Sequence, residues 1–297
     1  MKFKMIKSLP LLLIAFVMAA CGNNLEDDLS KYEQDTEELT QLNNNFNQQV
    51  GDMDFEKLEK MYYQEEEVDL QYLQDLISQV DKELVPLADD IGREAESITV
   101  ENEDIKEAHN IILEDVKVKQ DFTRQISSFL NGYMLSLEAN DQLVSLSQSF
   151  ITHQEERSKI IESAKTDEEI SEMNNLIEVL NANSEELEEH STTFHSEKSI
   201  EEKEQYVEET LLPLLDEHID RINALNLSTS KTTRARSISL EMYYNYQNYF
   251  EERKSVMVSA EQLQETALDN VLSLVDTART LDENYEKELE SLKNEAH

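Results

Sequence analysis

The sequence predicts an all-α protein, and three observations support this fold class. Only four Gly and three Pro occur in 297 residues, which leaves few of the turns that a β-rich chain needs. The β-branched runs that are typical of strands are lacking as well. Apolar residues instead recur at three- and four-residue spacing, as in helices that bury one face. We therefore expect an elongated up-and-down bundle of long helices with coiled-coil-like packing.

The first 20 residues have the pattern of an export signal rather than of a folded element. Lysines precede an apolar run from Leu9 to Ala20, which is much shorter than the roughly 20 residues that a membrane-spanning helix needs. The run ends in VMAAC at Cys21, the only cysteine of the chain. Small residues directly before a cysteine predict a bacterial lipobox, although Met18 stands where leucine is usual.

We expect cleavage after Ala20 and a diacylglyceryl group on the Cys21 sulfur. A lone cysteine cannot form an internal disulfide, and two acyl chains suffice for stable anchoring. Residues 21–24 would then form a short lipidated tether. The alternative is an ordinary secretory signal followed by an incidental cysteine.

Apolar stripes predict the helices in the first half of the chain. A stripe from Leu25 to Val50 ends at Gly51, and Asp52 or Asp54 can cap the next helix. Pro86 should end or kink that second helix. A very long stripe then runs from residue 105 to residue 150. The Asn131-Gly132 pair inside this stripe is a weak spot, a kink or a helix end rather than a β-turn, because the helical spacing continues through it.

The second half of the chain continues the helical pattern. Thr166 or Asp167 can cap one helix, and Ser199 can cap another that is bent at Pro213. A polar loop is expected at 226–233. The last stripe, from 235 to 292, predicts a helix of about 60 residues and roughly 90 Å. We predict that residues 25–297 form a single elongated domain.

Net charge excludes several kinds of partner. Without residues 1–20, which carry three lysines, 23 Lys+Arg stand against 65 Asp+Glu, a formal charge of 23 − 65 = −42. Nucleic acid requires a basic patch, which the chain lacks. Anionic lipid headgroups would repel the chain, so the acyl chains must hold it to the membrane unaided. Partners that are basic, or bridged by divalent cations, remain possible.

No motif in the sequence predicts catalysis or a cofactor. A Gly-rich phosphate loop, a closely spaced cysteine pair and a nucleophile motif are all missing, so we predict a protein that is not an enzyme. Glu186, His190 and His195 have spacings at which zinc can be bound. Acids are so frequent here that a Glu beside a His is expected by chance, and we predict no metal. The acid runs QEEEVD and DEEISE are interpreted as solvated helix faces.

The tyrosine-rich segment LEMYYNYQNYFEERK allows two interpretations. At 100° per residue, Tyr246 and Tyr249 fall on the core stripe, Tyr243 and Phe250 on a second strip, and Tyr244 near the opposite side. Such a segment is either a helix covered on several sides or an interaction patch made of Tyr243, Tyr244 and Phe250. We predict that Tyr246 and Tyr249 are core and that Tyr244 is exposed.

With VMAAC and with EMYY at 241–244, the chain resembles the EMYY-motif lipoproteins of Gram-positive bacteria. More loosely, it is similar to helical lipoproteins described as cell-wall-binding. Neither resemblance implies an established activity or catalytic residues. Both imply a lipid-anchored protein on the outer face of the cell membrane.

Together these observations predict a non-enzymatic surface protein that serves as a structural or interaction module for a protein or cell-envelope partner. The alternative is a solute- or metal-binding lipoprotein. Binding to the wall would have to be mediated by cations or by amines of peptidoglycan cross-bridges, because the chain carries −42.

Overall fold

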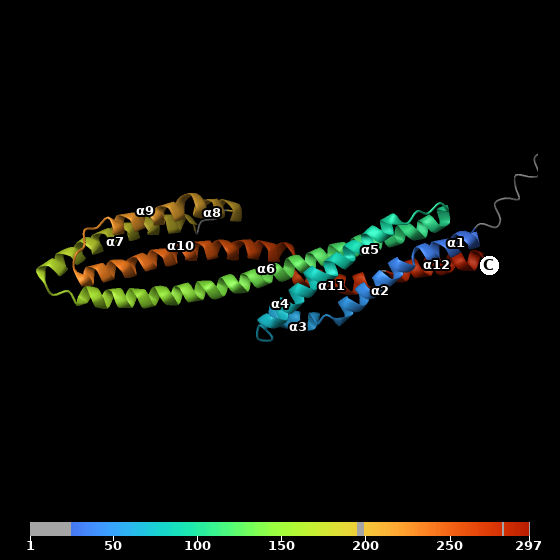
Figure 1. Ribbon diagram of the computed structural model, residues 1–297, viewed down its shortest axis with the longest axis horizontal. Helices are drawn as coiled ribbons and strands as arrows, with labels where there is room; N and C mark the ends of the chain where they lie inside the picture. The colour runs from blue at the N-terminus through green and yellow to red at the C-terminus, as the bar shows by residue number, and fades with distance from the viewer. Residues whose placement is uncertain (1–24, 195–198, 281, 297) are drawn as a thin grey trace, which may run out of the picture. The chain divides into compact units, whose positions relative to one another are not determined.

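The computed structural model describes residues 25–194, 199–280 and 282–296, which are helical over nearly their whole length (Figure 1). No β-strand occurs within these ranges, which confirms the all-α fold class. The signal segment and Cys21 lie outside the described residues. The chain divides into two compact units. That residues 25–297 form a single elongated domain stays a prediction. Unit 1 comprises the residues up to Ser127 and those from Leu268 onward, and unit 2 comprises Ser128–Ala267.

Unit 1 is formed by both ends of the chain. Its elements are α1 (Leu25–Asp35), α2 (Glu37–Asp52), α3 (Phe55–Tyr62), α4 (Leu70–Gln79), the π-helical turn η1 (Val80–Leu84), α5 (Val85–Ser97), the first part of α6 (Glu103–Glu162), α11 (Leu268–Thr280) and α12 (Asp282–Ala296). Asp54 caps α3, as predicted, by accepting a hydrogen bond from the Lys57 backbone N–H.

Unit 2 contains one continuous segment. Its elements are the remainder of α6, α7 (Asp167–Phe194), α8 (Ile200–Tyr206), the π-helical turn η2 (Val207–Leu211), α9 (Leu212–Asn223) and α10 (Ser230–Glu265). The helix α10 lies between α6 on one side and α7 and α9 on the other (Figure 1). The predicted cap at Ser199 is confirmed, since its side chain forms a capping box with Glu202.

Both prolines that we expected to end or bend a helix lie just after a π-helical turn. Pro86 follows η1 and Pro213 follows η2, and the helix continues across each proline. A proline ring clashes with the carbonyl four residues earlier in a regular α-helix. The π turn widens the helix at this place: Val85 donates to the Val80 carbonyl, five residues back, and an equivalent bond precedes Pro213.

Helix continuity at Gly132 and near residue 266 bears on two further predictions. Helix α6 runs through Gly132 without a break, so the Asn-Gly pair is not a helix end. The predicted helix from 235 to 292 is wrong, because α10 ends at Glu265 and α11 begins at Leu268. The hydroxyl of Thr266 donates to the Gln262 carbonyl, 2.6 Å away, and its backbone leaves the helical region. The apolar spacing hides this break, because each part of the stripe is buried in its own unit.

A polar cluster is buried in the core of unit 1. The Lys119 ammonium donates to both carboxylate oxygens of Asp282, each at 2.9 Å, and to the Asn43 amide oxygen at 2.9 Å. Asp115 lies one helical turn before Lys119, is buried, and leaves its Oδ2 atom without a hydrogen-bond partner among the described residues. Burial raises the pKa of Asp115 to about 6, and the nearby Asp282 carboxylate adds to this effect.

Asp115 should make stability depend on pH. Its folded pKa of about 6 lies above the value of about 4 expected in the unfolded chain, so the folded state binds this proton more tightly. That contribution is fully present below pH 4 and is lost as the pH rises through 6. Between pH 5 and pH 8, the stability of Asp115→Asn relative to the natural chain should therefore increase by about 1 kcal/mol. Urea unfolding at both pH values measures this.

The control for this prediction is Glu114→Gln, which removes the same charge from an exposed neighbour on α6. Its stability relative to the natural chain should change by less than about 0.5 kcal/mol over the same pH range. Equal behaviour of the two variants would contradict the assignment to Asp115.

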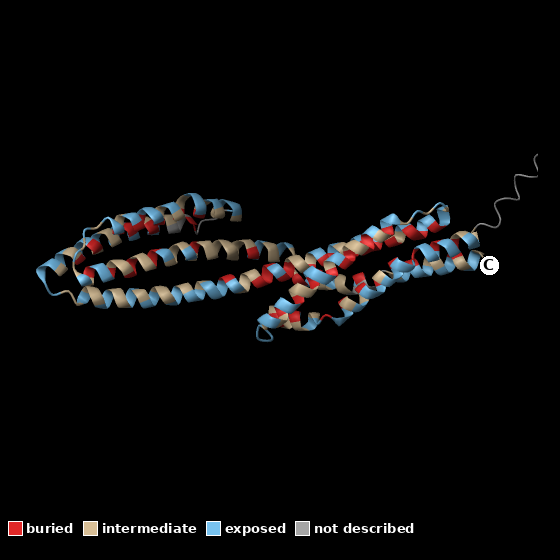
Figure 2. Ribbon diagram, in the orientation of Figure 1, coloured by how far each residue is buried: buried red, intermediate tan, exposed pale blue. Residues whose placement is uncertain are grey.

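Figure 2 shows the contrast between the buried inner faces of the helices and their exposed outer faces.

Candidate interaction site

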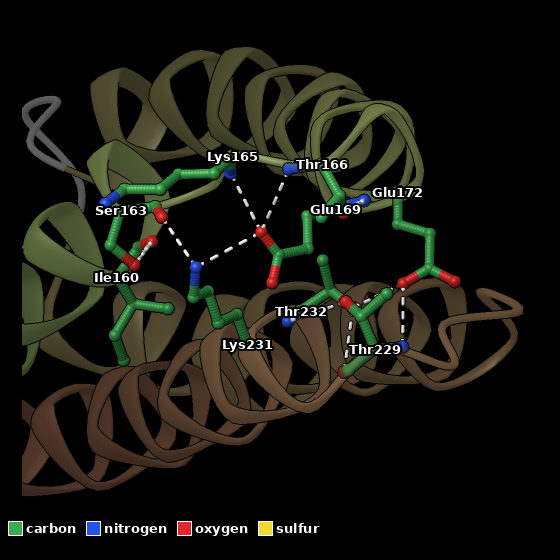
Figure 3. Close-up of polar contacts among 9 residues, drawn as sticks. All are labelled: Ile160, Ser163, Lys165, Thr166, Glu169, Glu172, Thr229, Lys231 and Thr232. Atoms are coloured by element: carbon green, nitrogen blue, oxygen red, sulfur yellow. Dashed lines mark hydrogen bonds and ion pairs between the residues drawn. The ribbon is translucent and has the colours of Figure 1, made fainter.

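The start of α10 is fixed by Glu172 of α7 (Figure 3). The Glu172 carboxylate accepts hydrogen bonds from the backbone N–H groups of Ser228 and Thr229, at 2.8 and 3.0 Å, and from the Thr232 hydroxyl, at 2.6 Å. The Ser228 hydroxyl also donates to this carboxylate, at 2.6 Å. The Ser228 hydroxyl bond, together with the bonds from Thr232 and the two backbone N–H groups, holds the pKa of Glu172 far below its usual range. Amide groups that a helix start would leave without partners are thereby satisfied by a neighbouring helix.

Lys231 joins the same helix start to the turn between α6 and α7 (Figure 3). Its ammonium donates to the Ser163 carbonyl at 2.6 Å and to Glu169 at 3.1 Å. Glu169 also accepts from the backbone of Lys165 and Thr166, and the Thr166 hydroxyl caps α7, as one of the two predicted caps. Two acids of the run DEEISE therefore hold helix ends, which corrects our interpretation of that run as a solvated face.

Helices α6 and α10 pair in antiparallel fashion within unit 2. The Lys231 ammonium contacts Ser163, Asn245 donates to the Ser149 hydroxyl at 3.0 Å, and Gln262 donates to the Ser128 carbonyl at 2.8 Å. Residue numbers thus fall along one helix as they rise along the other. The absence of a side chain at Gly132 leaves room for Gln262, since a Cβ there would stand only 3.1 Å from the Gln262 side chain.

An apolar groove of about 250 Å³ lies between these two helices. Its walls are formed by Leu146, Ser147, Phe150, Ile151, Asn245, Tyr246 and Tyr249. The rings of Phe150 and Tyr246 pack with their centroids 4.8 Å apart. Ile151, which lines the groove, is 50% exposed. Val144 is 69% exposed and lies seven residues before Ile151 on the same face of α6, so these two side chains form the rim of the groove on α6. Exposed apolar side chains beside an apolar groove mark a surface that another molecule could cover.

The groove is also free of formal charge, assuming neutral histidine. Neither the α6 segment from Gln142 to Gln154 nor the α10 segment from Met242 to Phe250 contains Asp, Glu, Lys or Arg, although charged residues make up 31% of the chain. Depletion of charge with enrichment of aromatic residues is the composition of interface centres. An uncharged run at 39–51 on α2 differs, because Leu39, Phe46 and Val50 are buried and the exposed side chains of the run are amides and one hydroxyl.

The tyrosine segment is covered on two sides. Tyr243 and Phe250 are buried against α9 and α7, where their ring centroids lie 5.7 Å from His218 and 5.8 Å from Phe194. Tyr246 and Tyr249, which we predicted as core, are half-buried in the groove because α6 covers that side only in part. The predicted exposure of Tyr244 is confirmed at 49%.

Comparison with known proteins identifies the family. A family model described as EMYY-motif containing lipoprotein matches residues 1–293. The chain belongs to this family. No curated protein and no solved structure matches the chain.

Membership in the EMYY-motif containing lipoproteins indicates a lipid-anchored surface protein. Among the described helices, none has the length and apolar character needed to cross a membrane.

The EMYY residues of this family member occupy different environments on α10. Glu241 lies 3.3 Å from His153 of α6, and Met242 is buried. Tyr243 is buried as well, so of the predicted patch of Tyr243, Tyr244 and Phe250 only Tyr244 is exposed. By helical geometry Tyr244 points about 150° away from the centre of the groove. A binding role for Tyr244 stays a prediction that is separate from the groove.

The candidate metal ligands of the sequence have other partners. Glu186 forms an ion pair with Arg221 at 2.8 Å and contacts the buried His218 at 3.0 Å. His190 contacts the Tyr206 hydroxyl at 2.7 Å, and His195 lies outside the described residues. Within the part of the chain that the structure describes, no group of three or more His, Cys, Asp or Glu is arranged to hold a metal ion.

Proposed function

We propose that this lipoprotein is a non-enzymatic interaction module of the cell envelope, and that the groove between α6 and α10 receives a protein partner. Family membership supports the lipid anchor. The observation that carries the docking role is an uncharged, apolar groove in a chain of formal charge −39. High net charge keeps a protein soluble and monomeric, so an uncharged apolar surface with exposed Val144 and Ile151 requires a separate reason.

The non-enzymatic part of the proposal rests on what the polar clusters do. The cluster of His218, Glu186 and Arg221 is the nearest in composition to a catalytic one. His218 is buried, and burial lowers the pKa of its imidazole. Arg221 binds both Glu186 oxygens, which ties α9 to α7. The Glu186 carboxylate is held by Arg221 and by the Nε2 atom of His218, while the buried Nδ1 atom of His218 has no partner among the described residues. The ties between α7 and α9 support a role in packing rather than in chemistry.

The second candidate function, solute binding, has one observation in its favour, the groove itself. Its volume of about 250 Å³ is slightly below the roughly 300–1,000 Å³ of typical small-molecule sites, and it is open at the rim. A protein segment would cover Val144 and Ile151 as well, whereas a small solute would leave them in water. Thermal-shift screening with metals, wall fragments and small solutes separates these candidates, and a micromolar small ligand would favour solute binding.

Anchoring at Cys21 is the first testable part of the proposal, and VMAAC motivates it. The natural chain should partition with membranes and incorporate labelled palmitate. Cys21→Ala should lose the label and move to the soluble or secreted fraction, because no acyl chain then holds a strongly acidic protein at an anionic membrane. A Cys21→Ala protein that remains lipid-labelled and membrane-bound would refute lipidation at this residue.

Docking at the groove is tested by Val144→Glu and Ile151→Glu. Both side chains are exposed, so the change should leave stability within about 0.5 kcal/mol while placing a charge at the rim of the apolar surface. We expect each variant to lose capture of envelope partners from crosslinked cells by about tenfold or more. Ile170→Glu on α7, 44% exposed in the natural chain, is the matched control and should capture normally.

Tyr244→Ala decides between the groove and the exposed tyrosine of the EMYY motif. It should leave capture unchanged, because Tyr244 faces away from the groove. Capture that depends on Tyr244 but not on Val144 or Ile151 would move the docking site to the motif face of α10.

A further inference from the structure

Two arginines of unit 2 differ from the others in this unit. Arg221 and Arg234 form ion pairs with glutamates, and Arg236 donates to a backbone carbonyl. Arg157 and Arg253 have neither a hydrogen bond nor an ion pair with any of the described residues, in a chain that contains 65 acids. Both are only partly exposed, and the Nε–H of Arg253 is buried without a partner.

The surroundings of Arg157 make its lack of a partner costly. Its guanidinium is an electrostatic neighbour of the Tyr243 and Tyr246 hydroxyls, and burial lowers the pKa of Arg157. An arginine keeps its charge even so. A cation that is partly removed from water is normally compensated by an acid or by backbone carbonyls. A carboxylate from another molecule would supply this compensation at both arginines.

Both arginines lie on the faces that form the groove. Arg157 follows Phe150 by seven residues on α6, and Arg253 follows Tyr249 by four on α10, so each continues its groove-lining face. Because the helices are antiparallel, the two arginines stand beyond opposite ends of the groove. Helical side chains lean toward the N-terminus of their own helix, so the side chains of Arg157 and Arg253 both lean toward the groove.

The separation of the two arginines follows from the pairing of the helices. Asn245 contacts Ser149, so Arg157 lies eight residues beyond this level on α6 and Arg253 eight residues beyond it on α10. At 1.5 Å per residue their Cα atoms are about 24 Å apart along the groove, and the inward lean brings the guanidinium groups to roughly 15 Å. On a bound helix, carboxylates about ten to fourteen residues apart would reach both.

We propose that the groove binds a helical segment of another envelope protein that is apolar on one face and carries a carboxylate near each end, paired with Arg157 and Arg253. This rests on the proposed docking function and adds the chemistry of the partner. A fatty acid fits less well, because it has a carboxylate at one end only. A second copy of this chain is disfavoured as well. Two copies of this acidic chain would repel each other. An uncharged surface about 20 Å long is also too short to bury the roughly 1,200 Å² that a stable interface needs.

Three synthetic helical peptides test the inference against the detergent-solubilised full-length protein. They share one apolar face and carry Glu, Gln or Lys at two positions eleven residues apart, and fluorescence anisotropy at physiological salt measures their affinities. The Glu peptide should bind about tenfold tighter than the Gln peptide, since charge-assisted bonds to arginine are the strong ones, and the Lys peptide should bind weakest. Equal binding of the three, or binding of none, overturns the inference.

Variants of the two arginines assign the preference to this site. The Arg157→Gln/Arg253→Gln double variant should bind the Glu peptide no better than the Gln peptide. Arg234→Gln removes a charge from the same helix pair, but one that is already paired with Glu156, and should retain the preference. Circular dichroism checks that the variants are folded. A preference that survives in the double variant overturns the inference, as does displacement of the Glu peptide by decanoate with the same dependence on the arginines.

The same variants separate this inference from the proposed function. If capture of envelope partners depends on Val144 and Ile151 but not on the arginines, docking at the groove stands and the acidic partner does not. If capture depends neither on Val144 and Ile151 nor on the two arginines, both the proposed docking function and the acidic partner are contradicted.

Discussion

The hydrogen-bonded cluster at the start of α10 is the interaction on which the candidate site depends. Glu172 binds the first amide groups before α10, and Lys231 ties its first turn to the α6–α7 turn. Side-chain direction changes by 100° per residue along a helix, so a slip of one residue would turn the groove wall away from α6. With the start of α10 fixed, Tyr246 and Tyr249 face α6, while Tyr243 and Phe250 face the core with α7 and α9.

Charge sets the contrast between the groove and the rest of the protein. Acids on most helices keep the chain in water and repel other anionic surfaces. Several of the others serve as helix caps or ion-pair partners, as Glu172 and Glu186 do. The walls of the groove carry Ser, Asn, Tyr, Phe and aliphatic residues in place of acids, and arginines without acidic partners stand beyond its ends. An arrangement of this kind rejects unspecific contact and favours a segment with an apolar centre and acidic ends.

The sequence was sufficient where the signal is local. Scarce Gly and Pro with three- and four-residue spacing predicted the all-α class, and Thr166 and Ser199 were recognisable caps. The helix break at Thr266 could not be recognised from the sequence, because threonine is no helix breaker and the apolar stripe continues across it. The groove was missed because its uncharged runs on α6 and α10 are about 90 residues apart, and antiparallel pairing brings them together. The pair Lys119–Asp282 is hidden for the same reason, since its members are 163 positions apart in the sequence.

Site-specific photo-crosslinking in living cells tests the docking role of the groove most directly. A benzoylphenylalanine introduced at Val144 or at Ile151 should give the same adduct with an envelope protein, because Ile151 lines the groove and the exposed Val144 lies two turns before it on the same face of α6. The same residue at Ile170, exposed on α7 of the same unit, should give none. Adducts from Ile170 that equal those from the rim, or adducts from Tyr244 with none from Val144 and Ile151, would contradict the account.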